Sequence, residues 1–235
     1  MRSVLALLYF SLLFTPSESA AKRSRLYVYT EHFPPYTVVT NDKEVSGSAV
    51  FTVKSALRMA GFEASIDIIP WARAYEMALT QPNTILFSMA KTQKREPLFH
   101  WLFKLTTLKY DFYTRGNTSL ELNSMEQALL YTTVAIRGSY EESKLRSLGF
   151  EVGKNLVLVA DMASAWQMLD KGRVDTMFAS HTPTQQTDGK PANQYKRQSA
   201  INDTHELFVV ASLTTSKKTI ASLKRAFALL ESDKE

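Results

Sequence analysis

The chain has 235 residues, a formal net charge of +5 at pH 7 and no cysteine. The lack of cysteine excludes a disulfide framework, a thiol nucleophile, a cysteine-ligated metal and a cysteine for lipid attachment. The positive charge could serve nucleic-acid binding, but the Lys and Arg residues are scattered along the chain. We therefore expect no nucleic-acid partner, and interpret the charge as favouring anionic solutes or solubility.

The first 21 residues have the pattern of a secretory signal peptide. Arg2 precedes a mainly apolar run from Val4 to Phe14, and small residues follow at Ser19, Ala20 and Ala21. The run is too short to cross a bilayer, which requires ~20 apolar residues. We expect cleavage after Ala21, with cleavage at Ser19 as the alternative, and a soluble mature protein exported to the periplasm.

Strands and helices are predicted to alternate in the first part of the mature chain. Spaced apolar residues indicate a helix at 48–60, and Pro70 begins a second helix that extends to about residue 79. Strands are expected at 25–30, 64–69 and 84–88. This β-α-β-α-β order favours parallel strands joined by crossover helices.

A second unit of similar size follows. A strand at 105–114 leaves the first unit, and a Ser124-x-x-Gln127 capping box begins a helix. Further expected elements are strands at 132–136, 156–160, 174–179 and 205–212, helices at 140–149, 161–172 and 216–230, and a loop at 181–198. We predict a bilobal α/β fold whose two lobes are joined by two extended hinge segments. Lobe 1 comprises residues 22–112 and 205–235, and lobe 2 comprises residues 113–204.

The segment from Ile85 to Trp101 carries the main indication of function. A β-like run ends near Ser88, and a single arginine, Arg95, follows before an aromatic cluster at Phe99 and Trp101. The planar fork of an arginine binds a carboxylate through two parallel hydrogen bonds, which a lysine cannot do. The segment therefore indicates a site for a carboxylate, the alternative being a surface turn with one solvated arginine.

Seven short motifs occur in order along residues 25–230. They are Phe33-Pro34-Pro35-Tyr36, Gly47, Pro70-Trp71-Ala72-Arg73, Thr92-x-x-Arg95, Val134-Ala135-Ile136-Arg137-Gly138-Ser139, Gly172-Arg173-Val174-Asp175 and Ser216-Lys217-Lys218. In these motifs the chain resembles the type II periplasmic solute-binding proteins that serve amino-acid ABC transporters. The resemblance implies two lobes that close on a small polar solute, bind it through the solute's own carboxylate, and deliver it to a membrane permease.

The resemblance also implies a role for each site residue. Phe33 would lie over the ligand side chain and Trp71 would form a second wall, although either ring could instead pack in a lobe interior. Ser88 and Arg95 would hold the ligand carboxylate. Gly138, Ser139 and Tyr140 lie at the start of a helix, where free N–H groups and the helix dipole favour an anion.

Two positions depart from the family pattern, one of them Ala90, which stands where the family often has a second hydroxyl. Amino-acid binders place a carboxylate for the ligand ammonium a few residues after the Gly-Arg-x-Asp turn, and here that position is Ser180. A serine accepts a hydrogen bond but provides no charge pair. We expect Ser180 at the site, so either the solute lacks an ammonium group or another acid, such as Glu31 or Glu141, replaces the missing one.

Three alternatives stay open from the sequence. Arg73 and Arg137 are further basic candidates that we interpret as solvated. Some proteins of this fold are exported enzymes, such as dehydratases of cyclic acids, and Glu31 or His32 would then supply acid–base chemistry. A sensory protein that binds a solute and contacts a membrane receptor is the third alternative. We expect a monomeric binding protein that is not an enzyme, with no cofactor and no metal, whose partners are a small solute and an ABC permease.

Overall fold

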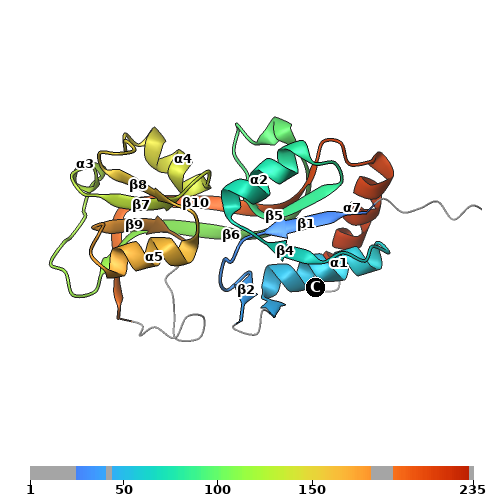
Figure 1. Ribbon diagram of the computed structural model, residues 1–235, viewed down its shortest axis with the longest axis horizontal. Coiled ribbons are helices and arrows are strands. Elements are labelled where there is room, and N and C mark those ends of the chain that lie inside the picture. Colours follow the sequence, from blue (N-terminus) through green and yellow to red (C-terminus); the bar gives the residue numbers. More distant parts are fainter. Residues whose placement is uncertain (1–24, 41–43, 181–192, 233–235) are drawn as a thin grey trace, which may run out of the picture.

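The computed structural model of the protein describes residues 25–40, 44–180 and 193–232. The predicted signal peptide at 1–21 and most of the predicted loop at 181–198 lie outside these residues. Figure 1 shows two α/β lobes side by side, connected by strands that pass from one lobe into the other. The predicted bilobal α/β fold is therefore confirmed.

One mixed sheet of eight strands extends through both lobes. Its strand order is β4-β1-β5-β10-β6-β9-β7-β8, and β2 (Val38–Val39) pairs separately with β3 (Val45–Ser46). The β4-β1-β5 part is parallel, as is the β9-β7-β8 part. The alternation of strands and helices thus gave the parallel pairing that the sequence predicts.

Lobe 1 places helices on both faces of its part of the sheet. Its strands are β1 (Tyr27–Thr30), β4 (Ile66–Ile68) and β5 (Thr84–Ala90), and its helices are α1 (Ser48–Met59), α2 (Trp71–Thr80) and α7 (Lys217–Ser232). Ile85 and Phe87 pack in one apolar cluster with residues of α1 and α7. Leu86 packs in the other cluster with residues of α2, because successive side chains of a strand point to opposite faces.

Lobe 2 repeats the arrangement on a smaller scale. Its strands are β7 (Thr133–Ile136), β8 (Leu156–Val159) and β9 (Thr176–Ala179), and its helices are α3 (Met125–Ala128), α4 (Tyr140–Ser147) and α5 (Met162–Asp170). Each helix begins at a capping side chain. Ser124, Ser139 and Asp161 accept hydrogen bonds from the backbone N–H groups of Gln127, Glu142 and Ser164.

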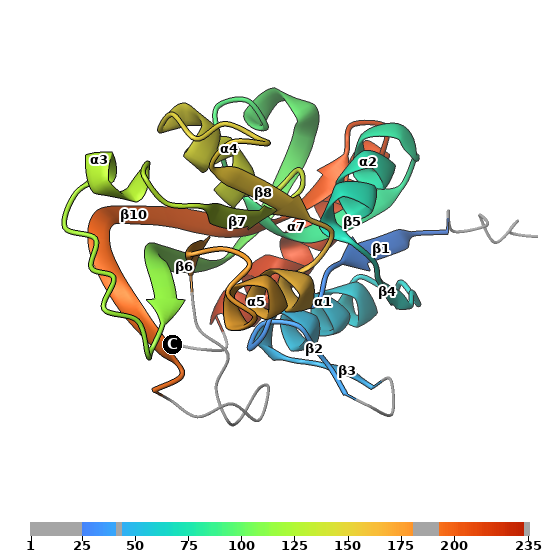
Figure 2. The same cartoon turned by 60° about the vertical axis from the view of Figure 1, so that its left-hand side comes forward.

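Two long strands pass from lobe to lobe. β6 (Phe99–Arg115) follows a short 3-10 helix, η1 (Glu96–Leu98), and is antiparallel to β10 (Tyr195–Ser212). β10 pairs with β5 of lobe 1, whereas β6 pairs with β9 of lobe 2. Figure 2 shows both strands extending through the junction. The lobe boundaries at 112/113 and 204/205 stay a prediction, since both fall within these continuous strands.

In two places the structure has more strand residues than the sequence predicts. The strand predicted to begin at residue 105 begins at Phe99, so the aromatic cluster at Phe99 and Trp101 belongs to β6. The end of the predicted loop at 181–198 is strand, because Tyr195 to Gln198 pair with Arg115 to Phe112. Pairing between segments about 80 residues apart decided this conformation, and local sequence carries no signal for it.

Within the described residues, none of the helices has both the length and the apolar character that a bilayer crossing requires.

Gly47, which precedes α1, is expected to tolerate no side chain. Its φ is +114°, and a Cβ atom there would lie 2.9 Å from the carbonyl oxygen of Pro35 and closer to that of Tyr36. Gly153 has a φ of +84° but no atom within 4 Å of such a Cβ. Gly153→Ala should therefore lose ~1 kcal/mol of unfolding free energy from backbone strain alone, and Gly47→Ala ~3 kcal/mol or more. Urea unfolding of both variants tests this, and equal losses would contradict the steric argument.

Candidate ligand-binding site between the lobes

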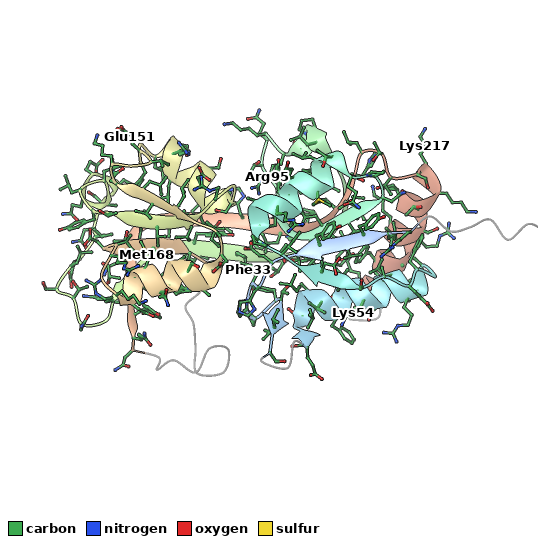
Figure 3. All side chains as sticks on the ribbon, viewed as in Figure 1. Phe33, Lys54, Arg95, Glu151, Met168 and Lys217 are labelled. Atoms are coloured by element: carbon green, nitrogen blue, oxygen red, sulfur yellow. The ribbon has the colours of Figure 1, made fainter. Side chains whose placement is uncertain are left out.

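A small cavity lies where the lobes meet. Side chains from both lobes line it, and its volume is about 20 Å³, which is room for one water-sized molecule. The lining residues are Glu31, Phe33, Trp71, Ser88, Ala90, Arg95, Tyr110, Ser139, Tyr140, Glu141 and Leu207. Figure 3 places the labelled Phe33 and Arg95 at this junction. A larger solute can enter only if the lobes or these side chains move apart.

Arg95 is held rigidly at this cavity. Its backbone N–H donates to the carbonyl oxygen of Thr92, which fixes the turn after β5. Its side chain is buried, with Nη1 donating to the carbonyl oxygen of Ala90 at 3.2 Å and Nη2 to that of Gly138 at 3.1 Å. The guanidinium also lies over the rings of Trp71 and Tyr75, 5.6 and 5.3 Å from their centroids. A further hydrogen bond joins the Arg95 side chain to that of Tyr75, so two of its five N–H donors are left for another acceptor.

Gly138 joins the two lobes through its carbonyl oxygen. Besides Arg95, the indole Nε1 of Trp71 donates to this oxygen, at 2.9 Å. Gly138 has a φ of +72°, and a Cβ there would lie 3.5 Å from that of Ala72. Two donors of lobe 1 thus converge on one acceptor of lobe 2. The structure describes the closed arrangement of the lobes.

Ser88 has an uncommon backbone conformation. Its φ is +64°, in the left-handed region, although it lies inside β5. The pairing of β10 with β5 changes register between Phe208 and Val210, opposite this residue. The buried Ser88 hydroxyl lines the cavity and has no hydrogen-bond partner in the described structure. Strain of ~1–3 kcal/mol and an unpaired buried hydroxyl at one residue are typical of a functional position.

Two carboxyl groups face the same cavity, that of Glu141 buried and that of Glu31 half-buried with its Oε2 atom shielded from solvent. Glu31 follows β1 in lobe 1, and Glu141 lies in the first turn of α4 in lobe 2. Burial raises the pKa of Glu31 well above its ordinary value, and the neighbouring charge of Glu141 raises it further. Burial also raises the pKa of Glu141, against hydrogen bonds from its own backbone and from Ser139. Arg95 lowers both pKa values, but it does not offset the effect of burial.

The start of α4 is largely satisfied by its own side chains. The Ser139 hydroxyl accepts from the N–H of Glu142 at 3.1 Å, and the N–H of Gly138 donates to the Glu142 carboxylate at 2.6 Å. Tyr140 donates to Asp203, which also pairs with Lys144 at 3.2 Å. In the closed arrangement, therefore, this helix end offers an anion fewer free N–H groups than the sequence predicts.

The structure brings most of the predicted site residues together. Phe33, Trp71, Ser88, Arg95, Ser139 and Tyr140 line the cavity, and Gly138 borders it through its two hydrogen bonds. Ser180 is half-buried and is not among the lining residues. Arg73 and Arg137 are exposed and lie outside the lining too, as expected for solvated arginines.

Sequence reasoning missed two of the lining residues, Tyr110 and Leu207, and treated a third, Ala90, only as a departure from the family pattern. Tyr110 and Leu207 come from the crossing strands β6 and β10, and Ala90 ends β5. The spacing of Leu108, Tyr110 and Phe112 indicates that the three side chains share one face of the strand. It does not indicate that Tyr110 lies at the lobe junction, because a two-residue period does not tell where along the strand the other lobe approaches.

The fold is that of the periplasmic binding proteins. A mutant of ArgBP from T. maritima superposes with a TM-score of 0.77 at 14% identity, over 89% of this chain and 90% of that chain. The amino acid ABC transporter substrate-binding protein AbpA from Streptococcus pneumoniae, bound to L-arginine, gives 0.75 at 16% identity, over 90% of each chain. A histidine kinase sensor domain with similarity to periplasmic binding proteins gives 0.78 at 14% identity, over 90% of this chain and 92% of that chain.

These likenesses confirm the fold-level resemblance to amino-acid-binding periplasmic proteins. No family model matches the chain, and no curated protein matches it in sequence. At 14–16% identity the solved structures establish a common fold. Among the described residues, no group of three or more His, Cys, Asp or Glu side chains could hold a metal ion.

Removing the indole donor of Trp71 should favour the open arrangement. Trp71→Phe keeps a ring and loses only the bond to Gly138, so the closed form should lose ~1 kcal/mol, about fivefold in the ratio of closed to open molecules. Small-angle X-ray scattering would detect this as a larger radius of gyration. Trp101→Phe is the matched control, because the Trp101 indole donates to Glu96 within lobe 1. An equal change in both variants would contradict a lobe-joining role.

Glu31 should destabilise the ligand-free protein at neutral pH. The unfolded chain loses this proton near pH 4.5, whereas the folded protein keeps it to higher pH. The free energy of unfolding therefore falls as the pH rises from that value toward the raised pKa. Glu31→Gln should make this fall smaller, leaving the part that comes from Glu141, and should be more stable at pH 7 by on the order of 1 kcal/mol. Thermal unfolding between pH 4 and pH 8 tests this, with the exposed Glu76→Gln as control, and a parent protein without the fall would contradict it.

Proposed function

We propose that the protein is a periplasmic solute-binding protein that holds a small, polar, carboxylate-bearing solute between its lobes. The observation that carries this proposal is Arg95, a buried and rigidly held guanidinium with free donors, beside the unpaired hydroxyl of Ser88. A carboxylate fits both, because it accepts two bonds from an arginine fork and a third from a hydroxyl. The fold supports the proposal, since similar structures are amino-acid-binding proteins.

The proposed mechanism is reversible closure of the lobes. Arg95 and Ser88 receive the carboxylate in lobe 1, and the two aromatic residues Phe33 and Trp71 cover the rest of the solute. Lobe 2 then closes through Ser139 and Tyr140. Because Arg95 already bonds to Gly138 of lobe 2, a carboxylate bound by Arg95 lies against the surface where the lobes meet. Binding energy is thus available to stabilise the closed form.

The proposed partner is an ABC transporter permease, to which a monomer would deliver the solute without any cofactor. This part rests on the likeness to an ABC transporter substrate-binding protein. The likeness to a histidine kinase sensor domain favours a second candidate, in which closure signals to a membrane receptor. We propose binding rather than catalysis, because the similar structures are binding proteins.

A thermal-shift screen of the mature protein tests solute binding. The panel consists of amino acids, dicarboxylates, opines and polyamines. A solute at a hundred times its Kd raises the free energy of unfolding by ~3 kcal/mol, which is several degrees for a chain of this size. At least one carboxylate should produce this shift. A panel in which only amines without a carboxylate bind would refute the proposed carboxylate site.

Substitution of Arg95 gives the second test. Arg95→Ala should weaken binding of the carboxylate found in the screen by ~3 kcal/mol or more, since the buried ligand charge loses its partner. Arg95→Lys should recover only part of this loss because it restores the charge without the fork. Isothermal titration calorimetry measures both, with the exposed Arg73→Ala as control. Unchanged affinity in Arg95→Ala would remove this residue from the site.

A further inference from the structure

The charges around the cavity do not balance. Glu31 comes from lobe 1 and Glu141 from lobe 2, and Arg95 is the one Lys or Arg residue in the cavity lining. Ionised, these three groups sum to one negative charge. Asp161, at the start of α5, adds a further unfavourable interaction with Glu31. A carboxylate-bearing solute on Arg95 would make the imbalance larger, unless the solute also brings positive charge.

Arg95 does not pair with either glutamate in the described structure. Its two side-chain hydrogen bonds with assigned distances go to the neutral carbonyl oxygens of Ala90 and Gly138. Within the described residues, no ion pair within 4.0 Å joins it to Glu31 or Glu141. The guanidinium is therefore available to a solute carboxylate, and the glutamates are available to something else.

Two buried polar atoms at the cavity lack hydrogen-bond partners and are therefore positions at which a solute could bind. The Oε2 atom of Glu31 and the Oγ atom of Ser88 are buried there without a hydrogen-bond partner in the described structure. Glu141 is also buried, with 8% of its surface exposed. A buried, unpaired polar atom costs ~1–3 kcal/mol, more when charged. A cationic nitrogen between the two glutamates would give the Oε2 atom of Glu31 a partner and would neutralise the charge of Glu141, whose carboxyl group already accepts hydrogen bonds from its own backbone and from Ser139.

We propose that Glu31 and Glu141 bind the basic nitrogens of the solute, and that the solute is a monocarboxylic acid with two basic groups, such as a diamino or guanidino acid. The inference rests on the proposed function, since it assigns the solute carboxylate to Arg95. One carboxylate then balances Arg95, and two cations balance the two glutamates. Glu31 and Glu141 would thus bind the solute ammonium group, a role that Ser180 does not fill because it lies outside the cavity lining.

The glutamates also connect recognition to closure. Glu31 belongs to lobe 1 and Glu141 to lobe 2, so a cation between them is fully surrounded only when the lobes are closed. A neutral solute of the same shape would leave the Oε2 atom of Glu31 without a hydrogen-bond partner and both carboxylates without a counter-charge. Selectivity for charge therefore follows from closure itself, because the closed form penalises a solute without basic groups.

Two sets of matched probes test the inference by calorimetry on the mature protein. L-Arginine is compared with its neutral isostere L-citrulline and with agmatine, which lacks the carboxylate. L-Lysine is compared in the same way with L-6-hydroxynorleucine, in which a neutral hydroxyl replaces the side-chain ammonium, and with cadaverine. In at least one set the basic amino acid should bind ~10–100-fold more tightly than its neutral isostere, the range expected for charged hydrogen bonds.

The probes separate this inference from the proposed function. The inference would be overturned if neutral or acidic amino acids bound as tightly as the basic ones, or if only neutral or acidic amino acids bound. Either outcome would leave the proposed carboxylate site intact. Agmatine or cadaverine that bind as tightly as the amino acids would overturn the proposed carboxylate site, and with it the solute class inferred here. Binding of none of the basic amino acids would overturn the inference.

Isosteric variants provide the residue-level test. Glu31→Gln and Glu141→Gln should each weaken binding of the basic amino acid by about tenfold or more. Each should also lower the ratio of its affinity to that of the neutral isostere. Glu126→Gln is the control, because Glu126 also lies in the first turn of a lobe 2 helix but outside the cavity lining. Because the two glutamates lie in different lobes, misfolding of one variant leaves the other informative. Unchanged selectivity in a folded Glu31→Gln or Glu141→Gln variant would remove that glutamate from the site.

Discussion

The antiparallel pairing of β6 with β10 determines where everything else in the molecule lies. β5, β1 and β4 continue the sheet from β10, while β9, β7 and β8 continue it from β6. The two lobes are therefore attached to different members of one hydrogen-bonded pair. The site lies beside this pair, since Tyr110 and Leu207 of the crossing strands are part of its lining. A rotation that bends the pair changes the distance between the lobes without unpairing the sheet inside either lobe, as hinge motion requires.

Several residues of the site lower the stability of the ligand-free protein. Ser88 holds a left-handed backbone conformation, and Glu31 and Glu141 bury carboxyl groups whose pKa values are raised mainly by burial. None of these features helps the ligand-free protein to fold. They are concentrated at the one place where Trp71 and Arg95 of lobe 1 meet Gly138 of lobe 2. The buried cores on both faces of the sheet supply the stability that this local cost requires.

Much of the fold could be predicted from the sequence because local signals specify it. The apolar period of α1 and the capping residues Ser124 and Asp161 act within a few residues, and the structure has these helices where they were expected. The first part of β10 could not be predicted, because Gln198 becomes strand only by pairing with Phe112. Likewise, the motifs indicated Arg95 and Ser88, but the acceptor role of the Gly138 carbonyl depends on how the lobes close. The position of Ser180 outside the lining is of the same kind, since motif spacing does not fix a distance across a cleft.

The path of the chain has a consequence for the order in which the molecule can be completed. Lobe 1 begins with β1 and is finished only by the end of β10 and by α7, after every strand of lobe 2 has been made. Until then β5 lacks its partner on one side, and Ile85 and Phe87 lack α7, one of the two helices that cover them. A chain that emerges from its N-terminus can therefore complete lobe 2 first, while the earlier-made half of lobe 1 waits with an open sheet edge. An open sheet edge can pair with other chains, so this molecule is most exposed to aggregation before β10 and α7 have been made.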